Sequence, residues 1–233
     1  MSLTVVCWKW KQPNYRSKFR ACHVNTLHSM VSRNLKIDHR FVCVTDDPSG
    51  IECDTVPLWD EPKIILPKGK PNCYRRLKAF APDAGDIFGT DWVLSLDLDA
   101  VIVDDMTDLV TSKMSKPFTI WGDTAKNTLY NGSMWLLKLG SYPDVWTDLP
   151  RDPYAVTRAR NIIGSDQAWI SHKLGNGQPT WGTNDGVYSY RVHLKSGLTG
   201  LPNNAKIVFF HGRIDPWDTL AKARSPWISD LYK

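Results

Sequence analysis

The motif with the clearest chemistry is a pair of carboxylates, Asp97 and Asp99, on either side of Leu98. They follow the apolar run 92–96, which is typical of a buried strand. In an extended segment alternate side chains point the same way, so we expect both carboxylates on one face and Leu98 on the other. Two carboxylates this close repel unless a cation lies between them, and such oxygens suit Mg²⁺ or Mn²⁺. The motif predicts a divalent-cation site; the alternative is an acidic turn at a strand end.

A histidine ends a second apolar run. His211 follows residues 207–210 and precedes Gly212, which lets a ligand approach the backbone closely. Neutral imidazole is a good ligand for Mn²⁺. A single histidine is usually a core or surface residue, so only the carboxylates make His211 a candidate third ligand.

Two further segments carry polar groups. Asp166 and Gln167 begin an expected helix after Ser165, where they could hydrogen-bond sugar hydroxyls or simply complement the helix dipole. In the basic segment 74–78, one arginine together with Lys78 or Lys9 could reach a pyrophosphate. Neighbouring arginines point to different sides of a helix, and a solvated basic face is the alternative.

The elements that must position these residues alternate along the first half. We expect strands at 3–8, 40–45, 56–59 and 92–96, with helices at 15–34 and 73–80. This order predicts an α/β fold with an open, mostly parallel sheet and helices on both faces. Ligands bind such sheets outside the carboxyl ends of the strands, where segments 8–10, 45–47 and 97–99 fall.

The second half is less regular. We expect strands at 118–121, 133–139, 187–192 and 206–210, a helix at 165–174, a helix or loop at 153–161 and a loop at 175–185. Composition does not shift sharply anywhere, so residues 1–233 are expected to form a single domain.

Composition narrows the class of protein. The formal charge is +5 and the chain has no dense Lys/Arg run, so a nucleic-acid partner is not required.

The five cysteines lack a CxxC spacing, which argues against zinc or a disulfide framework, and Cys7 and Cys43 are expected in the core. With no signal peptide and no apolar stretch of membrane-spanning length, the sequence predicts a soluble, cytoplasmic protein. Most of the eleven tryptophans are expected in the core and a minority in a cleft.

Taken in order, these motifs resemble glycosyltransferases of the GT-A fold, in the retaining branch of glycogenin-like and lipopolysaccharide-galactosyltransferase-like enzymes. The resemblance runs from Thr4 to about Asp218 and rests on segments 74–77, 97–99, 131–133, 166–167 and 210–217. It implies a Rossmann-like domain with a nucleotide-binding half, 1–105, and a half for sugar and acceptor, 106–233. The implied activity is transfer of a sugar from a nucleotide sugar, most often a UDP-sugar, with retention.

The resemblance also implies roles for residues. Asp97, Asp99 and His211 would bind Mn²⁺ or Mg²⁺. Asn131, Asp166 and Gln167 would face the donor sugar as the catalytic candidates. The nucleotide and its phosphates would be bound by Trp8, Lys9, Thr45, Asp46, Arg76, Lys78, Asp97 and Gly212. The family has a lysine before its Pro-Trp pair that binds the pyrophosphate; Asp215 stands there, and Arg213 or Lys9 are the candidates to replace it.

Other functions stay open at this point. The acceptor could be a saccharide, a small molecule, a protein or a hydroxylated base in DNA. A carbohydrate- or nucleic-acid-binding module without catalysis is the alternative outside enzymes. A metal-dependent phosphotransferase or nuclease would need more carboxylates around its metals than this single pair supplies.

Overall fold

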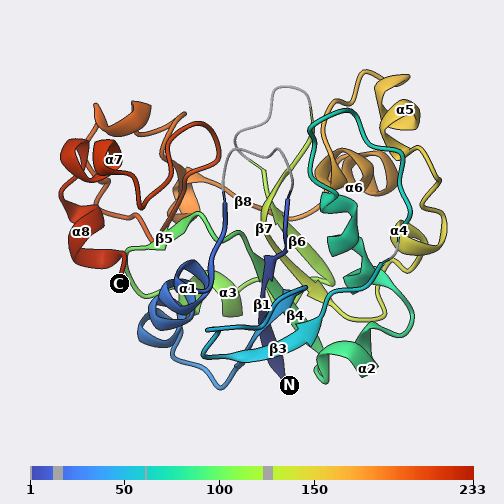
Figure 1. The fold of residues 1–233 in the computed structure, drawn as a ribbon, viewed down its shortest axis with the longest axis horizontal. Helices are drawn as coiled ribbons and strands as arrows, with labels where there is room; N and C mark the ends of the chain where they lie inside the picture. Colours follow the sequence, from blue (N-terminus) through green and yellow to red (C-terminus); the bar gives the residue numbers. More distant parts are fainter. Residues whose placement is uncertain (1, 13–17, 61, 123–127) are drawn as a thin grey trace.

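The computed structural model describes residues 2–12, 18–60, 62–122 and 128–233. A seven-stranded sheet in the order β3-β2-β1-β4-β7-β6-β8 forms the centre of the molecule, and a three-stranded sheet, β5-β10-β9, lies to one side (Figure 1). In the large sheet β7 alone runs against its neighbours, so the expected open, mostly parallel sheet is confirmed.

The strands of the large sheet are β1 (Leu3–Lys9), β2 (Arg40–Thr45), β3 (Asp54–Pro57), β4 (Trp92–Leu96), β6 (Phe118–Trp121), β7 (Asn131–Lys138) and β8 (Thr180–Trp181). Expectations for β1, β2, β4 and β6 agree with the structure to within one residue. These strands are buried on both faces, which makes them visible as continuous apolar runs. The short β8 lies in a segment expected to be a loop.

Helices cover both faces of the large sheet, as predicted. Helix α1 (Ala21–Asn34) buries Val24, Leu27 and Val31 against one face. The 3₁₀ helix η1 (Cys73–Phe80) and helix α6 (Asp166–Leu174) pack on the opposite face. The expected helix at 15–34 begins only at Ala21; residues 13–17 lie outside the described part of the chain.

The other helices are short. They are α2 (Ala84–Phe88), α3 (Thr107–Thr111), α4 (Asp144–Thr147), α5 (Pro153–Arg158), η2 (Thr183–Asp185), η3 (Lys195–Gly197), α7 (Thr219–Arg224) and α8 (Trp227–Leu231). Helices α7 and α8 lie beside the small sheet, at the left of Figure 1.

The small sheet joins the two halves of the sequence. Strand β10 (Ile207–Phe209) pairs antiparallel with β5 (Ala100–Ile102) and parallel with β9 (Val187–Ser189). Strand β5 was not expected from the sequence, because only four residues separate Asp99 from the next polar residues, Asp104 and Asp105. Its residues belong to the same hydrophobic core as α1, so the two sheets form one domain.

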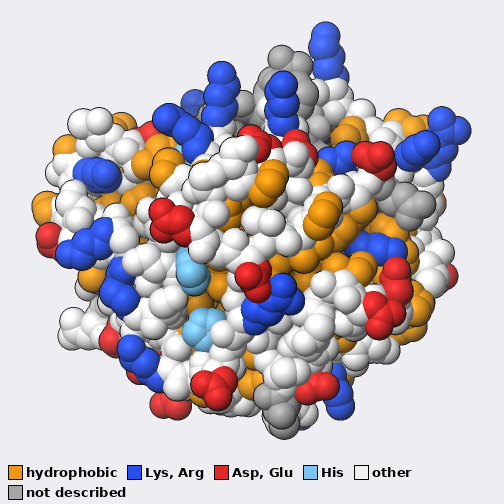
Figure 2. Space-filling model, turned by 60° about the horizontal axis from the view of Figure 1, so that its bottom comes forward, with side chains coloured by type: hydrophobic (Ala, Val, Ile, Leu, Met, Phe, Trp, Pro, Cys, Tyr) orange, Lys and Arg blue, Asp and Glu red, His pale blue; other side chains and the backbone are white. Residues whose placement is uncertain are grey.

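The surface and interior agree with the composition. On the face shown in Figure 2, charged side chains of both signs are interspersed. Cys7 and Cys43 are fully buried in the core, as predicted. No helix among the described residues is long and apolar enough to cross a membrane.

Candidate functional site

The acidic motif is a turn that carries the chain from β4 in the large sheet to β5 in the small one. The expectation of an extended segment is therefore wrong, because Leu98 and Asp99 turn between two strands of different sheets. Leu98 is buried in the core and anchors the turn. Asp97 and Asp99 nevertheless line the same pocket, at the carboxyl end of β4.

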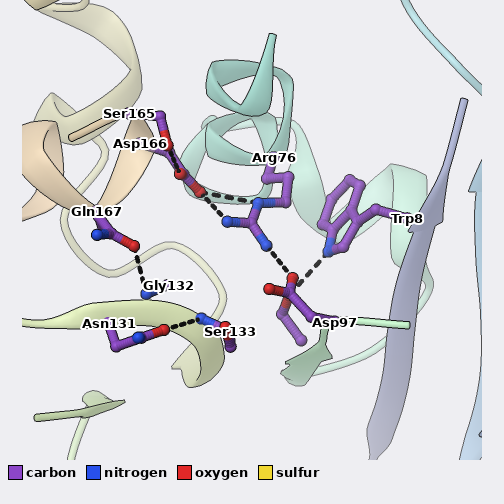
Figure 3. A network of polar contacts seen from close by, with 10 residues as sticks. Trp8, Arg76, Asp97, Asn131, Gly132, Ser133, Ser165, Asp166 and Gln167 are labelled. Carbon is purple, nitrogen blue, oxygen red and sulfur yellow. Dashed lines mark hydrogen bonds and ion pairs between the residues drawn. The ribbon is translucent and has the colours of Figure 1, made fainter. Parts of the chain in front are cut away.

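A buried arginine lies at the centre of the polar network in this pocket (Figure 3). The guanidinium of Arg76, from η1, forms an ion pair with Asp97 and contacts Asp166 Oδ2 through Nε at 2.8 Å and a terminal nitrogen at 2.5 Å. The second carboxylate oxygen of Asp166 accepts a hydrogen bond from Ser165 Oγ at 2.8 Å. One cation thus holds two carboxylates from distant segments, and Arg76 is the arginine of segment 74–78 that lies in this network.

The charges of this network depend on one another. Burial lowers the pKa of Arg76, and the carboxylates of Asp166 and Asp97 more than offset this, so its pKa lies above the ordinary value. Burial raises the pKa of Asp166, and the guanidinium opposes the rise. Removing the cation would leave a fully buried carboxylate without compensation, which is strongly unfavourable.

The start of β7 lies against this network. Gly132 N–H donates to Gln167 Oε1 at 3.1 Å, and Ser133 N–H donates to Asn131 Oδ1 at 2.9 Å. Figure 3 shows the amide nitrogen of Gln167 pointing away from Gly132. A hydrogen bond of 2.9 Å from Asp97 N–H to Ser133 carbonyl ties β7 to the acidic turn. Asn131, Asp166 and Gln167, which were expected to face the donor sugar, thus all lie beside the Arg76 network.

His211 meets the acidic turn from the small sheet. The N–H of Phe210 donates to the carbonyl of Asp99 at 2.9 Å, which places His211 at the pocket that Asp97 and Asp99 line. Burial, and then the charge of Arg191, lowers the pKa of His211 to about 4, so its imidazole is neutral at pH 7. Its buried Nε2 has no hydrogen-bond partner among the described residues.

These residues have the donor chemistry of a divalent-cation site. Two carboxylates and a neutral imidazole suit Mn²⁺ or Mg²⁺, and the buried Nε2 of His211 is a ligand atom with no other partner in the described chain. As they stand, however, no three His, Cys, Asp or Glu side chains among the described residues are grouped closely enough to hold a metal ion. Substrate oxygens would have to complete the coordination.

Next to this pocket lies a second hollow, which shares Trp10 and Phe19 with it and is lined by Lys9 and Asp46. Asp46 accepts a hydrogen bond from Lys11 N–H at 2.9 Å. Trp8 lines the first pocket and its indole donates to Ser95 Oγ at 2.8 Å. Trp8 and Trp10 are therefore two of the tryptophans that line the cleft.

Two cations expected at a pyrophosphate are engaged elsewhere. Lys78 pairs with Asp83 at 3.0 Å and lies over the ring of Trp146, because residues two apart on a helix face different sides and Arg76 takes the inner one. The ammonium of Lys9 is buried and donates to Asp47 carbonyl at 2.7 Å and Thr45 Oγ1 at 3.3 Å. Thr45 therefore holds Lys9, and neither lysine extends into the pocket of Asp97.

The sequence analysis missed Arg191. It is exposed, follows β9 and packs over Gly212, where an added Cβ would lie 3.2 Å from Arg191 Cδ. Gly212 has a φ of 149°, which favours glycine at this place. The sequence around Arg191 carries no motif, and only the fold brings it beside His211.

A seven-stranded, mostly parallel sheet with a polar site at the carboxyl ends of β1 and β4 is the GT-A-like fold found in glycosyltransferases. Over 99% of its length the chain is similar to the galactosyltransferase LgtC, solved with donor and acceptor sugar analogs, at 13% identity, 96% coverage of that chain and a TM-score of 0.63. It is also similar to the glycosyltransferase GlyE of Streptococcus pneumoniae TIGR4, with 13% identity and a TM-score of 0.59; 95% of this chain aligns with 59% of that one. No protein-family model and no curated protein matches the sequence.

Proposed function

We propose that this protein is a glycosyltransferase that moves a sugar from a nucleotide-sugar donor, a UDP-sugar by the family resemblance, to an acceptor. The observation that carries the proposal is the pocket that Asp97, Asp99 and His211 line beside the Arg76 network, at the carboxyl edge of a GT-A-like sheet. Ligands bind α/β sheets at this edge. The fold alone would support many functions, so the site has to carry the argument.

We propose Asp97, Asp99 and His211 as the ligands of Mn²⁺ or Mg²⁺. Such an ion, when bound together with the donor, offsets the negative charge that develops on the leaving diphosphate. The neutral His211 is ready to donate its lone pair, since its pKa of about 4 keeps it unprotonated at pH 7.

Arg76 positions the carboxylates. Its contacts with Asp97 and Asp166 orient one carboxylate toward the ion site and the other toward the start of β7. A preorganised pair of this kind needs little rearrangement when substrate binds. We therefore assign Arg76 to positioning within the donor site.

Gln167 and Asn131 are proposed to face the sugar. Gln167 accepts from Gly132 through its oxygen, which leaves its amide nitrogen to donate to a sugar hydroxyl. An active-site glutamine-to-glutamate mutant of LgtC has been solved, which supports a functional glutamine in this fold. The nucleoside is proposed to lie in the hollow lined by Lys9, Trp10 and Asp46.

The test is release of nucleoside diphosphate from a panel of nucleotide sugars with Mn²⁺. We expect turnover of at least one donor by the wild type, and a loss of at least a hundredfold in Asp97→Asn and Asp99→Asn. The matched control is Asp86→Asn, the same chemical change at an exposed site on α2. If no donor is turned over, or if Asp86→Asn is as damaging as the other two, the proposal fails.

We propose retention at the anomeric carbon, on the resemblance of the late segment around His211 to retaining glycosyltransferases. NMR of the product made by the wild type should show the same anomeric configuration as the donor. A product of inverted configuration contradicts this part of the proposal.

A further inference from the structure

A third hollow lies between the loop 62–72, α5 and the start of α6, at the upper right of Figure 1. Its volume is about 280 Å³, close to the lower end for small-molecule sites, and we name it the α5–α6 cavity. Gln167 lines it, and so do Pro71 and Cys73, which also line the pocket of the proposed ion site. The cavity therefore adjoins the donor site at a residue proposed to face the sugar.

The loop that borders the cavity is held in place at two points. Asn72 Nδ2 donates to the carbonyl of Pro62 at 3.2 Å, which closes the loop. Ile65 N–H donates to the carbonyl of Arg151 at 2.8 Å, which ties the loop to the segment before α5. Three prolines within the loop restrict its backbone further. The cavity is thus preformed, and a ligand would not have to order its walls.

The buried wall of the cavity is polar. Beside Gln167 lie Ser165 and Tyr74, and the Tyr74 side chain is only 1% exposed. Its hydroxyl has no hydrogen-bond partner among the described residues. Burial, and then the charge of Asp166, raises the pKa of Tyr74, so the hydroxyl stays protonated and can donate. A buried hydroxyl without a partner is unfavourable, and a hydroxyl of a bound ligand would supply one.

The outer wall is apolar. Leu66, Pro67 and Pro71 line it from the loop, and Ile163 lines it from the segment before α6. Ile163 is 45% exposed, so an apolar ligand in the cavity would remove a large aliphatic side chain from water. Tyr154, from α5, adds an aromatic ring, which packs well against another flat ring.

These two walls discriminate among the kinds of acceptor that the sequence left open. Of the described residues that line the cavity, only Lys70 is charged. A nucleic acid needs several cations for its phosphates, and the many hydroxyls of an oligosaccharide need polar partners on every side. The cavity therefore favours a small molecule that is polar at one end and apolar at the other.

We infer that the α5–α6 cavity binds the acceptor, and that this acceptor joins a hydroxyl-bearing end to a flat apolar ring, as an aryl glycoside does. The inference rests on the proposed function and deepens it. The hydroxyl end would lie against Gln167 and Tyr74, and the ring between Ile163 and Tyr154. In the transfer, the acceptor oxygen forms the bond to the anomeric carbon, the bond from that carbon to the diphosphate oxygen breaks, and the hydroxyl proton goes to the leaving diphosphate.

The experiment is calorimetry on the full chain with UDP and Mn²⁺ present. The probes are the 4-nitrophenyl and methyl β-D-glucosides and β-D-galactosides, which within each pair differ in the ring alone. In at least one pair, the 4-nitrophenyl glycoside should bind about tenfold more tightly, because its ring leaves water. Ile163→Ser and Tyr154→Ala should each weaken its binding roughly fivefold, and Tyr74→Phe should weaken binding of both members of the pair about threefold.

The matched control is Ile65→Ser. It makes the same change at an isoleucine of similar exposure, 50%, that lies in the bordering loop but does not line the cavity. Equal affinities within both pairs of probes overturn the inference, even if donor turnover is found. A loss in Ile65→Ser as large as that in Ile163→Ser overturns it as well.

A kinetic arm separates the inference from the proposed function. Where a donor is turned over, the 4-nitrophenyl glycoside should accelerate release of nucleoside diphosphate, and Ile163→Ser should raise the KM for this glycoside about fivefold. A glycoside that binds in the expected order but leaves the rate unchanged contradicts the acceptor role. If the binding order holds and no nucleotide sugar is turned over, the site for apolar rings stands, whereas the proposed function and the acceptor role fall.

Discussion

At the residue scale, the site depends on which side chains are charged and which are kept neutral. Arg76 is a buried cation between two carboxylates, whereas His211 is a buried imidazole held neutral. Burial disfavours the charged form of both side chains. Arg76 stays charged because it lies against carboxylates, whereas burial and the charge of Arg191 keep His211 neutral. The types of these residues could be read from the sequence; their protonation could not, because it depends on neighbours that are distant along the chain.

His23 offers a test of this burial effect away from the ion site. It is buried, stacks on Trp217 with ring centroids 3.9 Å apart, and its Nδ1 accepts a hydrogen bond from Arg20 N–H at 3.1 Å. Burial, and then the charge of Arg20, lowers its pKa from 6.5 to about 4. Between these values the unfolded chain binds more protons than the folded chain, so the free energy of unfolding must rise with pH across this window.

We therefore expect the wild type to lose stability as pH falls from about 6.5 toward 4, by on the order of 2 kcal/mol through His23. His23→Asn keeps a hydrogen-bond acceptor but does not titrate. The free energy of unfolding of the wild type minus that of the variant should therefore increase as pH rises through this window and stay constant above it. Urea unfolding at several pH values measures the gap. Parallel pH profiles for the two proteins would contradict the expectation.

At the element scale, the site is made where β7 begins between η1 and α6. At Gly132 the backbone of β7 comes close to the side chains of η1 and α6. An added Cβ would lie 3.0 Å from a terminal nitrogen of Arg76 and 3.4 Å from Gln167 Cβ. Any residue can adopt the backbone dihedral angles of Gly132. Glycine is required because a larger side chain would collide with its neighbours. The sequence segment 131–133 was recognised as part of a motif, but this reason for its glycine appears only in the structure.

Gly132→Ala should therefore displace Arg76 or Gln167 while leaving the fold intact. We expect the turnover number for donor to fall at least tenfold, because small displacements of positioning groups are costly. Gly85→Ala is the control, since an added Cβ there meets nothing within 4 Å and alanine favours the helix it lies in. Equal activity of wild type and Gly132→Ala would show that this close contact does not matter for the reaction.

How much of the fold could be predicted differs by element. Strands β1, β2 and β4 were clear because both their faces are buried and their apolar runs are unbroken. Strand β5 was not, because in the described part of the chain its three residues pair with β10, more than a hundred residues later. The acidic pair could be located because it follows the apolar run of β4, but its turn could not be predicted, because that turn leads into β5. Arg191 follows no pattern at all and depends entirely on β9 lying beside β10.

At the scale of the whole molecule, ligand binding and stability should be coupled. The proposed ion ligands come from both sheets, so donor and ion together would join β4, β5 and β10. With UDP at about one hundred times its dissociation constant, the free energy of unfolding should rise by about 2.7 kcal/mol. For a domain of this size this corresponds to a rise in melting temperature of roughly 5 to 10 °C.

Scanning fluorimetry with UDP and Mn²⁺ measures this shift. EDTA and the Asp99→Asn substitution should each remove most of it, because the phosphates would lose their bridging ion. A UDP-dependent shift that survives both treatments would contradict a metal-dependent site.

The position of β10 has a consequence for how the chain can be divided. Strand β10 lies between β5 and β9. The first half of the sequence supplies β5, and the strand that pairs with it, β10, comes from the second half. A fragment ending near residue 105 would leave β5 and the far side of β4 with open hydrogen-bonding edges, which favours aggregation. Residues 1–105 are therefore no independent module: their sheet edges are covered only once β10 has been synthesised, so the proposed ion site and the core around β5 are completed by the same strand.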